Sequence, residues 1–150
     1  MKESIGLTVT INIIIIFTLT AFVFTVGIYT YYKAFKASSL IIKSLEKYEG
    51  YNDLAYDQIN KDLYTVGYLL GDSSKCSETK NATIGEGRLV TVDDSEKFQY
   101  CIYFFDNDGD EKHYSYGVVT YMSLDFYMFG TKVKFPIFGR TRRIYRYTNT

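Results

Sequence analysis

The sequence predicts an α+β protein: a long N-terminal membrane helix that continues as an amphipathic stalk, a short second helix, and a small antiparallel sheet of about four strands. Two observations lead to this prediction. Helical periodicity extends from a long uncharged run to residue 48, and from residue 88 the pattern changes to short β-rich runs. We expect an anchor helix, a stalk with a second helix, and a sheet domain, over residues 1–32, 33–70 and 71–150.

The uncharged run from Ser4 to Tyr32 contains no histidine and no proline. Because a helix needs roughly 20 apolar residues to cross a bilayer, this run is long enough to span. A cleavable signal peptide has a shorter apolar region, of roughly 7 to 15 residues, and a small-residue cleavage site. Here the helical pattern continues beyond Tyr32, so we expect the anchor to be retained in the membrane.

The stalk is predicted as a continuation of the same helix from Lys33 to Tyr48, ended by Gly50. Asn52 or Asp53 is expected to cap a second helix. That helix is predicted over Leu54 to Leu70, with an apolar stripe formed by Leu54, Ile59, Leu63, Val66 and Leu70.

The sheet is predicted from four β-rich runs, the last of them bent at Pro136 and Gly139. The runs are Arg88–Val92, Phe98–Phe105, His113–Met122 and Lys132–Tyr147. Either the long helix or the short one is expected to cover the apolar face of this sheet. The 16 Tyr and 11 Phe residues suit strands, although a codon preference of the source genome would also enrich them.

The charges and the single histidine indicate a protein that is neither nucleic-acid-binding nor enzymatic. Lys plus Arg total 17 and Asp plus Glu total 17, so no net positive charge favours nucleic acid. Only His113 is available for a catalytic triad or a histidine metal site, and no cofactor is expected. Asp106, Asp108 and Asp110 resemble the start of a calcium loop, but the glutamate expected at its twelfth position is absent. A solvated hairpin loop is therefore favoured over a metal site.

Two features disagree about the side of the membrane on which the domain lies. Lysines are more frequent after the span than before it, which by the positive-inside rule places the domain in the cytoplasm. Cys76 and Cys101, the only cysteines, suit a disulfide in an oxidising compartment, the alternative being a free Cys101 in the core. Because whole domains translocate with little regard to nearby charge, we expect a disulfide and an extracytoplasmic domain.

The order of a half-apolar, half-amphipathic helix and then a small sheet is similar to the plan of type IV pilins and pseudopilins. Three stretches resemble TadE-like proteins of tight-adherence pilus systems more closely. They are Gly6-Leu7-Thr8-Val9-Thr10, Tyr31-Tyr32-Lys33-Ala34-Phe35-Lys36-Ala37 and Pro136-Ile137-Phe138-Gly139-Arg140-Thr141-Arg142-Arg143-Ile144-Tyr145. The resemblance implies a non-enzymatic subunit that acts with other pilin-like or secretion-system subunits.

The resemblance also implies a processing site, at which a glycine is followed five residues later by a glutamate. Gly6 matches the glycine, but the fifth residue after it is Ile11. From the residues themselves, Asn12 and Gly27 are the candidates for packing between helices in the membrane, where small and polar residues mediate association. We expect Asn12 to replace the missing glutamate in part, by bonding to the helix of a neighbour.

The C-terminal basic run is a candidate docking patch for an acidic surface, although a solvated edge strand protected by its charges explains the run as well. It comprises Arg140, Arg142, Arg143 and Arg146. The sequence therefore predicts a single-pass, pilin-like minor subunit of a bacterial pilus or secretion apparatus. The alternative is a membrane-tethered, extracytoplasmic binding or sensor module that does not polymerise.

Overall fold

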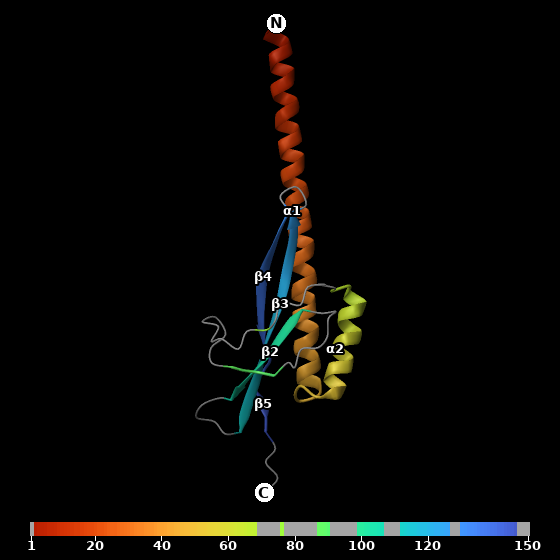
Figure 1. Cartoon of the computed structure of the whole chain (residues 1–150), viewed down its shortest axis with the longest axis vertical. Helices are drawn as coiled ribbons and strands as arrows, with labels where there is room; N and C mark the ends of the chain where they lie inside the picture. The colour runs from red at the N-terminus through yellow and green to blue at the C-terminus, as the bar shows by residue number, and fades with distance from the viewer. Residues whose placement is uncertain are drawn as a thin grey trace.

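The computed structural model describes residues 2–68, 76, 87–90, 99–106, 112–126 and 130–146. It has two helices and a five-stranded antiparallel sheet that packs against the long helix (Figure 1). The helices are α1 (Lys2–Lys47) and α2 (Asp53–Val66), and the strands are β1 (Arg88–Leu89), β2 (Tyr100–Asp106), β3 (His113–Phe126), β4 (Thr131–Arg140) and β5 (Ile144–Tyr145). The predicted α+β class is confirmed.

Helix α1 is a single helix of 46 residues that passes without a break from the apolar run into the stalk. It ends where the chain leaves helical geometry. Glu49 adopts a left-handed conformation with φ 51° and Gly50 follows with φ 145°. The Gly50 amide donates to the Leu45 carbonyl at 2.9 Å, which satisfies one of the carbonyls at the end of the helix.

Helix α2 begins at the expected cap, since the Asn52 side chain accepts a hydrogen bond from the Ala55 amide at 2.9 Å. It ends at Val66, earlier than the predicted Leu70, because Gly67 adopts the left-handed conformation with φ 67°. The predicted stripe is wrong at Leu54, whose side chain is 65% exposed. The buried face consists of Ala55, Ile59 and Leu63 and packs on α1.

The strand order is β1-β2-β3-β4, and β5 pairs with the start of β3 on the edge that β4 occupies further along, opposite to β2. The predicted single bent strand over 132–147 is wrong, because it is interrupted between Arg140 and Ile144. At the interruption Thr141 bonds to Tyr116 twice: its amide donates to the Tyr116 carbonyl, and its hydroxyl accepts from the Tyr116 amide, both at 2.9 Å. The side chain of Thr141 thus replaces one backbone group of the ladder and lets the chain turn toward β5.

The main core lies between one face of the sheet and the C-terminal half of α1. Small and apolar side chains of α1 recur at helical spacing on the buried face. They are Ala34, Ala37, Ile41 and Leu45. Strand β4 approaches this helix closely at Gly139, where an added Cβ would lie 2.6 Å from Ile42 Cδ1 and 2.8 Å from Ser38 Oγ. A side chain at position 139 would therefore force Ile42 and Ser38 to shift.

A smaller core lies on the opposite face of the sheet, around the disulfide. Its buried members are Cys101, Tyr103, Phe105 and Val119. Gly87, next to β1, lies against the Phe105 ring, and an added Cβ would be 2.7 Å from that ring. The sheet is thus apolar on both faces, with α1 covering only one of them.

Candidate membrane anchor and docking surfaces

The N-terminal half of α1 extends beyond the rest of the molecule (Figure 1). From Gly6 to Tyr32 every residue is exposed except Gly27 and Thr30, which are half-buried. The helix is long and apolar enough to cross a membrane, and none of its most apolar window is buried within the molecule. A stretch of this kind, placed at the N-terminus, serves as a membrane anchor or as a signal sequence.

The polar residues of this segment differ in whether their hydrogen bonds are satisfied inside the helix. Five threonine hydroxyls donate to the carbonyl four residues earlier, at 2.8 to 2.9 Å. Asn12 is exposed on the helix surface. Gly6 and Gly27 have open space where a Cβ would stand. The threonines therefore need no partner outside the helix, whereas the Asn12 amide is available to a neighbouring helix or to lipid headgroups.

Tyrosine and lysine side chains mark the end of the apolar segment. Lys33 Nζ lies 4.8 Å from the centre of the Tyr29 ring, and Lys36 Nζ lies 5.9 Å from that of Tyr32. Both amines point back toward the N-terminus, as long helical side chains do. Tyrosines and lysines are the residues that favour the membrane–water interface. We call these four residues the Tyr–Lys belt; for a helix that spans a membrane, a belt of this kind is expected at the interface, here near residues 29–36.

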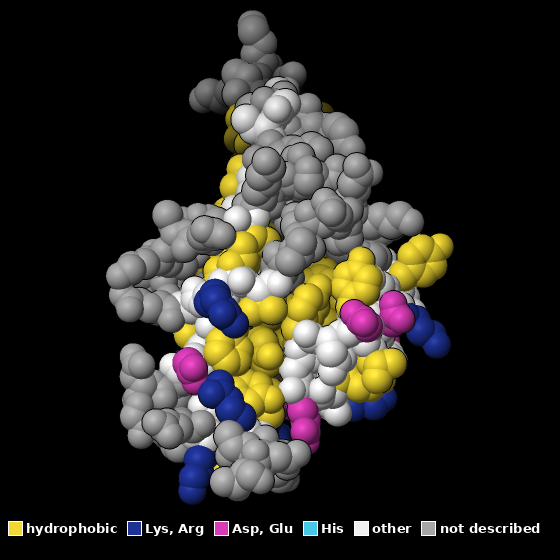
Figure 2. All heavy atoms as spheres, turned by 60° about the horizontal axis from the view of Figure 1, so that its bottom comes forward, with side chains coloured by type: hydrophobic (Ala, Val, Ile, Leu, Met, Phe, Trp, Pro, Cys, Tyr) yellow, Lys and Arg dark blue, Asp and Glu magenta, His cyan; other side chains and the backbone are white. Residues whose placement is uncertain are grey.

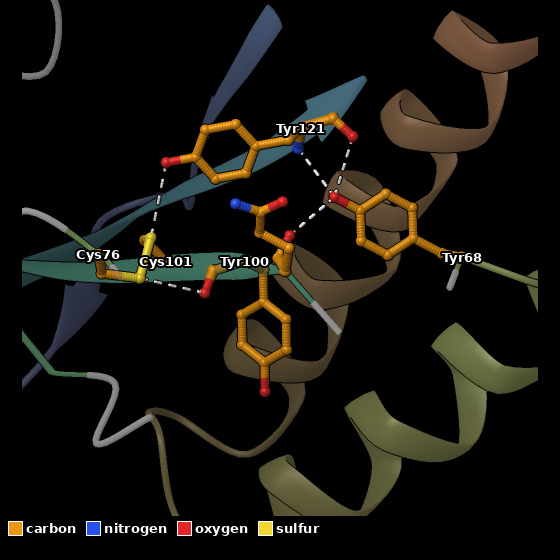
Figure 3. The surroundings of a disulfide bond; sticks show 6 residues. Tyr68, Cys76, Tyr100, Cys101 and Tyr121 are labelled. Atoms are coloured by element: carbon orange, nitrogen blue, oxygen red, sulfur yellow. Dashed lines mark hydrogen bonds between the residues drawn. A yellow bond between two sulfur atoms is a disulfide. The ribbon is translucent and has the colours of Figure 1, made fainter. Parts of the chain in front are cut away.

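The disulfide between Cys76 and Cys101 is present, with a Cα–Cα distance of 5.7 Å, as the sequence predicted. It ties Cys76 to the middle of the sheet through β2, next to the Tyr121 side chain (Figure 3). The Tyr121 hydroxyl lies 3.8 Å from Cys101 Sγ. Because a disulfide sulfur has no hydrogen, the hydroxyl is the donor in this contact.

Tyr68, just after α2, joins the helices to the sheet at the same place (Figure 3). Its hydroxyl accepts from the Tyr121 amide at 2.8 Å and lies 2.8 Å from the Gln99 carbonyl and 3.1 Å from the Tyr121 carbonyl. Burial raises the pKa of the Tyr68 phenol far above its usual value, although the backbone bond to Tyr121 lowers it in part. This anchoring tyrosine was not identified from the sequence, where one Tyr among 16 gives no signal.

The four arginines of the candidate docking patch do not lie on one strand, and two of them are engaged within the molecule. The Arg140 guanidinium donates to Ser115 Oγ at 2.9 and 3.1 Å and lies 4.7 Å from the centre of the Phe105 ring. Arg146 pairs with Asp106 at 3.2 Å. Arg142 and Arg143 lie in the irregular segment and are exposed. The Arg142 backbone amide donates to Glu46 of α1 at 2.8 Å.

The candidate calcium residues are only partly described. Asp106 accepts from Arg146, whereas Asp108 and Asp110 lie outside the described residues. Among the residues that the structure describes, no group of three or more His, Cys, Asp or Glu side chains is arranged to hold a metal ion. The His113 ring packs on Tyr145 with centroids 5.4 Å apart.

An aromatic cluster lies at the end of the sheet domain that is distant from the anchor. Phe104, Tyr114 and Tyr116 contact one another with ring centroids 5.5 to 5.9 Å apart. Arg88 lies over Phe104 and Arg146 over Tyr114, each 5.6 Å from the ring centre. Figure 2 shows hydrophobic side chains at the surface of this end, with Lys and Arg side chains beside them.

Comparison with known proteins gives no match: no family model, no curated protein and no solved structure is significantly similar to the chain.

Proposed function

We propose that this protein is a membrane-anchored, pilin-like minor subunit, of the TadE-like kind, in a bacterial surface pilus or secretion apparatus. The main supporting observation is that one unbroken helix, Lys2–Lys47, is a bare apolar rod in its N-terminal half and the scaffold of a sheet domain in its C-terminal half. A helix used for assembly needs this division, because the rod must be free to contact lipid or other helices. The subunit acts by packing and display and performs no catalysis.

The rod is apolar around its whole circumference. Four consecutive large side chains, which point in four different directions around the helix, are each exposed by half or more: Ile13 (61%), Ile14 (58%), Ile15 (50%) and Ile16 (65%). A membrane removes this surface from water. Within the membrane, specific association depends on close packing and polar contacts. The Asn12 side-chain amide is the strongest hydrogen-bonding group exposed on the rod.

The disulfide supports an extracytoplasmic place for the sheet domain. Disulfides persist in oxidising compartments and are rare in the cytoplasm. The bond between Cys76 and Cys101 therefore argues against the cytoplasmic location that the lysine count predicts. The domain is accordingly displayed on the outer side of the membrane.

A membrane-tethered binding module that does not polymerise is the second candidate function. The aromatic cluster with Arg88 and Arg146 favours it, because aromatic rings beside guanidinium groups form adaptable recognition surfaces. In this alternative the apolar rod contacts only lipid, and the membrane-distal end binds the partner.

Substitution of Asn12 distinguishes the two functions. Asn12→Leu removes a polar contact worth about 1 kcal/mol between helices, so recovery of other membrane subunits in a pull-down should fall about fivefold. The matched control is Ile11→Leu, which changes the neighbouring residue without changing polarity. Expression and the melting temperature of the sheet domain should stay unchanged in both variants. Equal recovery with both variants would contradict the assembly role of Asn12.

A further inference from the structure

Strand β3 runs along α1 toward the membrane. Near its start, the Tyr114 hydroxyl donates to the Glu49 carbonyl at 2.8 Å, close to the C-terminal end of α1. Further along, the Thr120 hydroxyl donates to the Ala34 carbonyl at 3.1 Å. The strand therefore advances from the end of the helix to the edge of the Tyr–Lys belt in six residues.

The β3–β4 hairpin continues beyond this point. From Thr120 to Phe126 the strand adds six residues, about 20 Å, which corresponds to about 13 residues of helix. If the strand follows the helix at the same slope, Phe135, which pairs with Met122 two residues past Thr120, is level with about Thr30, and the end of the strand is level with about Ala21. Figure 1 shows the hairpin extending alongside α1 in this direction.

The end of the hairpin has an apolar face that is only partly covered. Pairs in register place Phe135 opposite Met122 and Val133 opposite Leu124 on this face. Phe135 is 47% exposed and Val133 is 37% exposed. Apolar side chains at the level of a membrane surface are continuous with the apolar surface of the span.

The opposite face of the hairpin end is polar and largely basic in sequence. In register, Lys134 stands opposite Ser123 and Lys132 opposite Asp125. Lys134 thus lies on the same end of the sheet as Lys33 and Lys36 of α1. Lysines near a bilayer surface are attracted to anionic lipid, each by about 1 kcal/mol.

We propose that the membrane-proximal part of the β3–β4 hairpin, formed by residues 122–124 and 133–135, is a second membrane contact, in which Phe135 and Val133 enter the interface of an anionic bilayer while Lys134, on the opposite face of the hairpin, faces the headgroups. The contact fixes the tilt and rotation of the sheet domain relative to the membrane. It goes beyond the proposed function, since it depends on α1 spanning the membrane and not on assembly with other subunits.

The absence of tryptophan from the chain allows a direct test. Single tryptophans are introduced into the full-length protein as Phe135→Trp, Phe17→Trp in the span, and Tyr145→Trp at the membrane-distal end. Each variant is reconstituted into phosphatidylcholine vesicles with or without phosphatidylglycerol, and fluorescence is compared between brominated and ordinary acyl chains. Phe17→Trp is the positive control and Tyr145→Trp is the negative control.

In anionic vesicles, quenching of Phe135→Trp should reach at least about half of that of Phe17→Trp, and Tyr145→Trp should be quenched by less than about a tenth as much. Quenching of Phe135→Trp as weak as that of Tyr145→Trp would overturn the proposal. Equal quenching in neutral and anionic vesicles would contradict the role of the lysines. Unquenched Phe17→Trp would instead contradict the membrane anchor itself.

Discussion

The hydroxyl group of Tyr68 occupies the place of the next rung of the sheet beside Tyr121. Strand β2 begins at Tyr100, which pairs with Thr120, so the next pair would be Gln99 with Tyr121. The Tyr68 hydroxyl lies there instead, 2.8 Å from both the Tyr121 amide and the Gln99 carbonyl. One side chain from the end of the helical segment thus closes the ladder and fixes the sheet to the helices.

Removal of this hydroxyl should destabilise the domain. Tyr68→Phe leaves the buried Tyr121 amide and Gln99 carbonyl without their partner, which costs about 1 to 3 kcal/mol. The matched control is Tyr64→Phe, at a side chain that is 74% exposed, and it should have almost no effect. Thermal unfolding of both variants in detergent, followed by circular dichroism, measures the difference. Equal melting temperatures would contradict the anchoring role of Tyr68.

Stability should also decrease at alkaline pH because of Tyr68. Its pKa is raised by burial, so the folded state favours the neutral phenol. Tyr68 contributes its full stabilisation below about pH 10. Above that pH the free energy of unfolding falls by about 1.4 kcal/mol per pH unit, until the pH reaches the pKa of Tyr68 in the folded state. Tyr103, Tyr114 and Tyr121 have raised pKa values as well. Between pH 10 and pH 11 the free energy of unfolding of Tyr68→Phe should therefore decline less steeply than that of the native protein, by about the contribution of one tyrosine.

Reduction of the disulfide should lower stability and reveal the side of the membrane. The sequence separation of 25 residues corresponds to a stabilisation of about 3 kcal/mol, or about 10 °C in melting temperature. On intact cells, a membrane-impermeant thiol reagent should label the protein only after reduction, because Cys76 and Cys101 are then the only thiols. Labelling that appears only after cell lysis would place the domain in the cytoplasm.

The close approach of β4 to α1 predicts an unequal response to two glycine substitutions. Gly139→Ala forces Ile42 and Ser38 to move, which should cost about 1 to 3 kcal/mol. Gly6→Ala, where nothing lies within 4 Å, should leave the unfolding free energy unchanged. Chemical denaturation in detergent compares the two variants. A Gly139→Ala variant as stable as Gly6→Ala would show that the helix and strand can separate without cost.

The elements that the sequence predicted well are those specified by a long regular pattern. The uncharged run and the helical spacing after it predicted α1 to within two residues at its start and one at its end. The break after Arg140 was missed because it depends on Thr141, whose hydroxyl replaces a backbone group of the ladder only once Tyr116 is beside it. A side chain that substitutes for backbone leaves no periodic signal.

The candidate sites were predictable to a similar degree. Cysteine parity was enough to predict the disulfide, since only one pairing exists. The basic run was wrongly assigned to a single strand, because alternation was assumed to continue past Arg140. The stacking of Arg140 on Phe105 and its bonds to Ser115 depend on three separate strands meeting, which no local pattern encodes.

Photo-crosslinking from the apolar rod tests the central claim most directly. A photoreactive residue placed at Phe17, which is 74% exposed, reports what contacts α1 in the native membrane, and the same residue at Tyr145 is the control. If the chain is a pilin-like subunit, the probe at position 17 should form protein adducts with other membrane-anchored subunits or with a second copy of the chain. Adducts with lipid alone would contradict the assembly function and favour the tethered module.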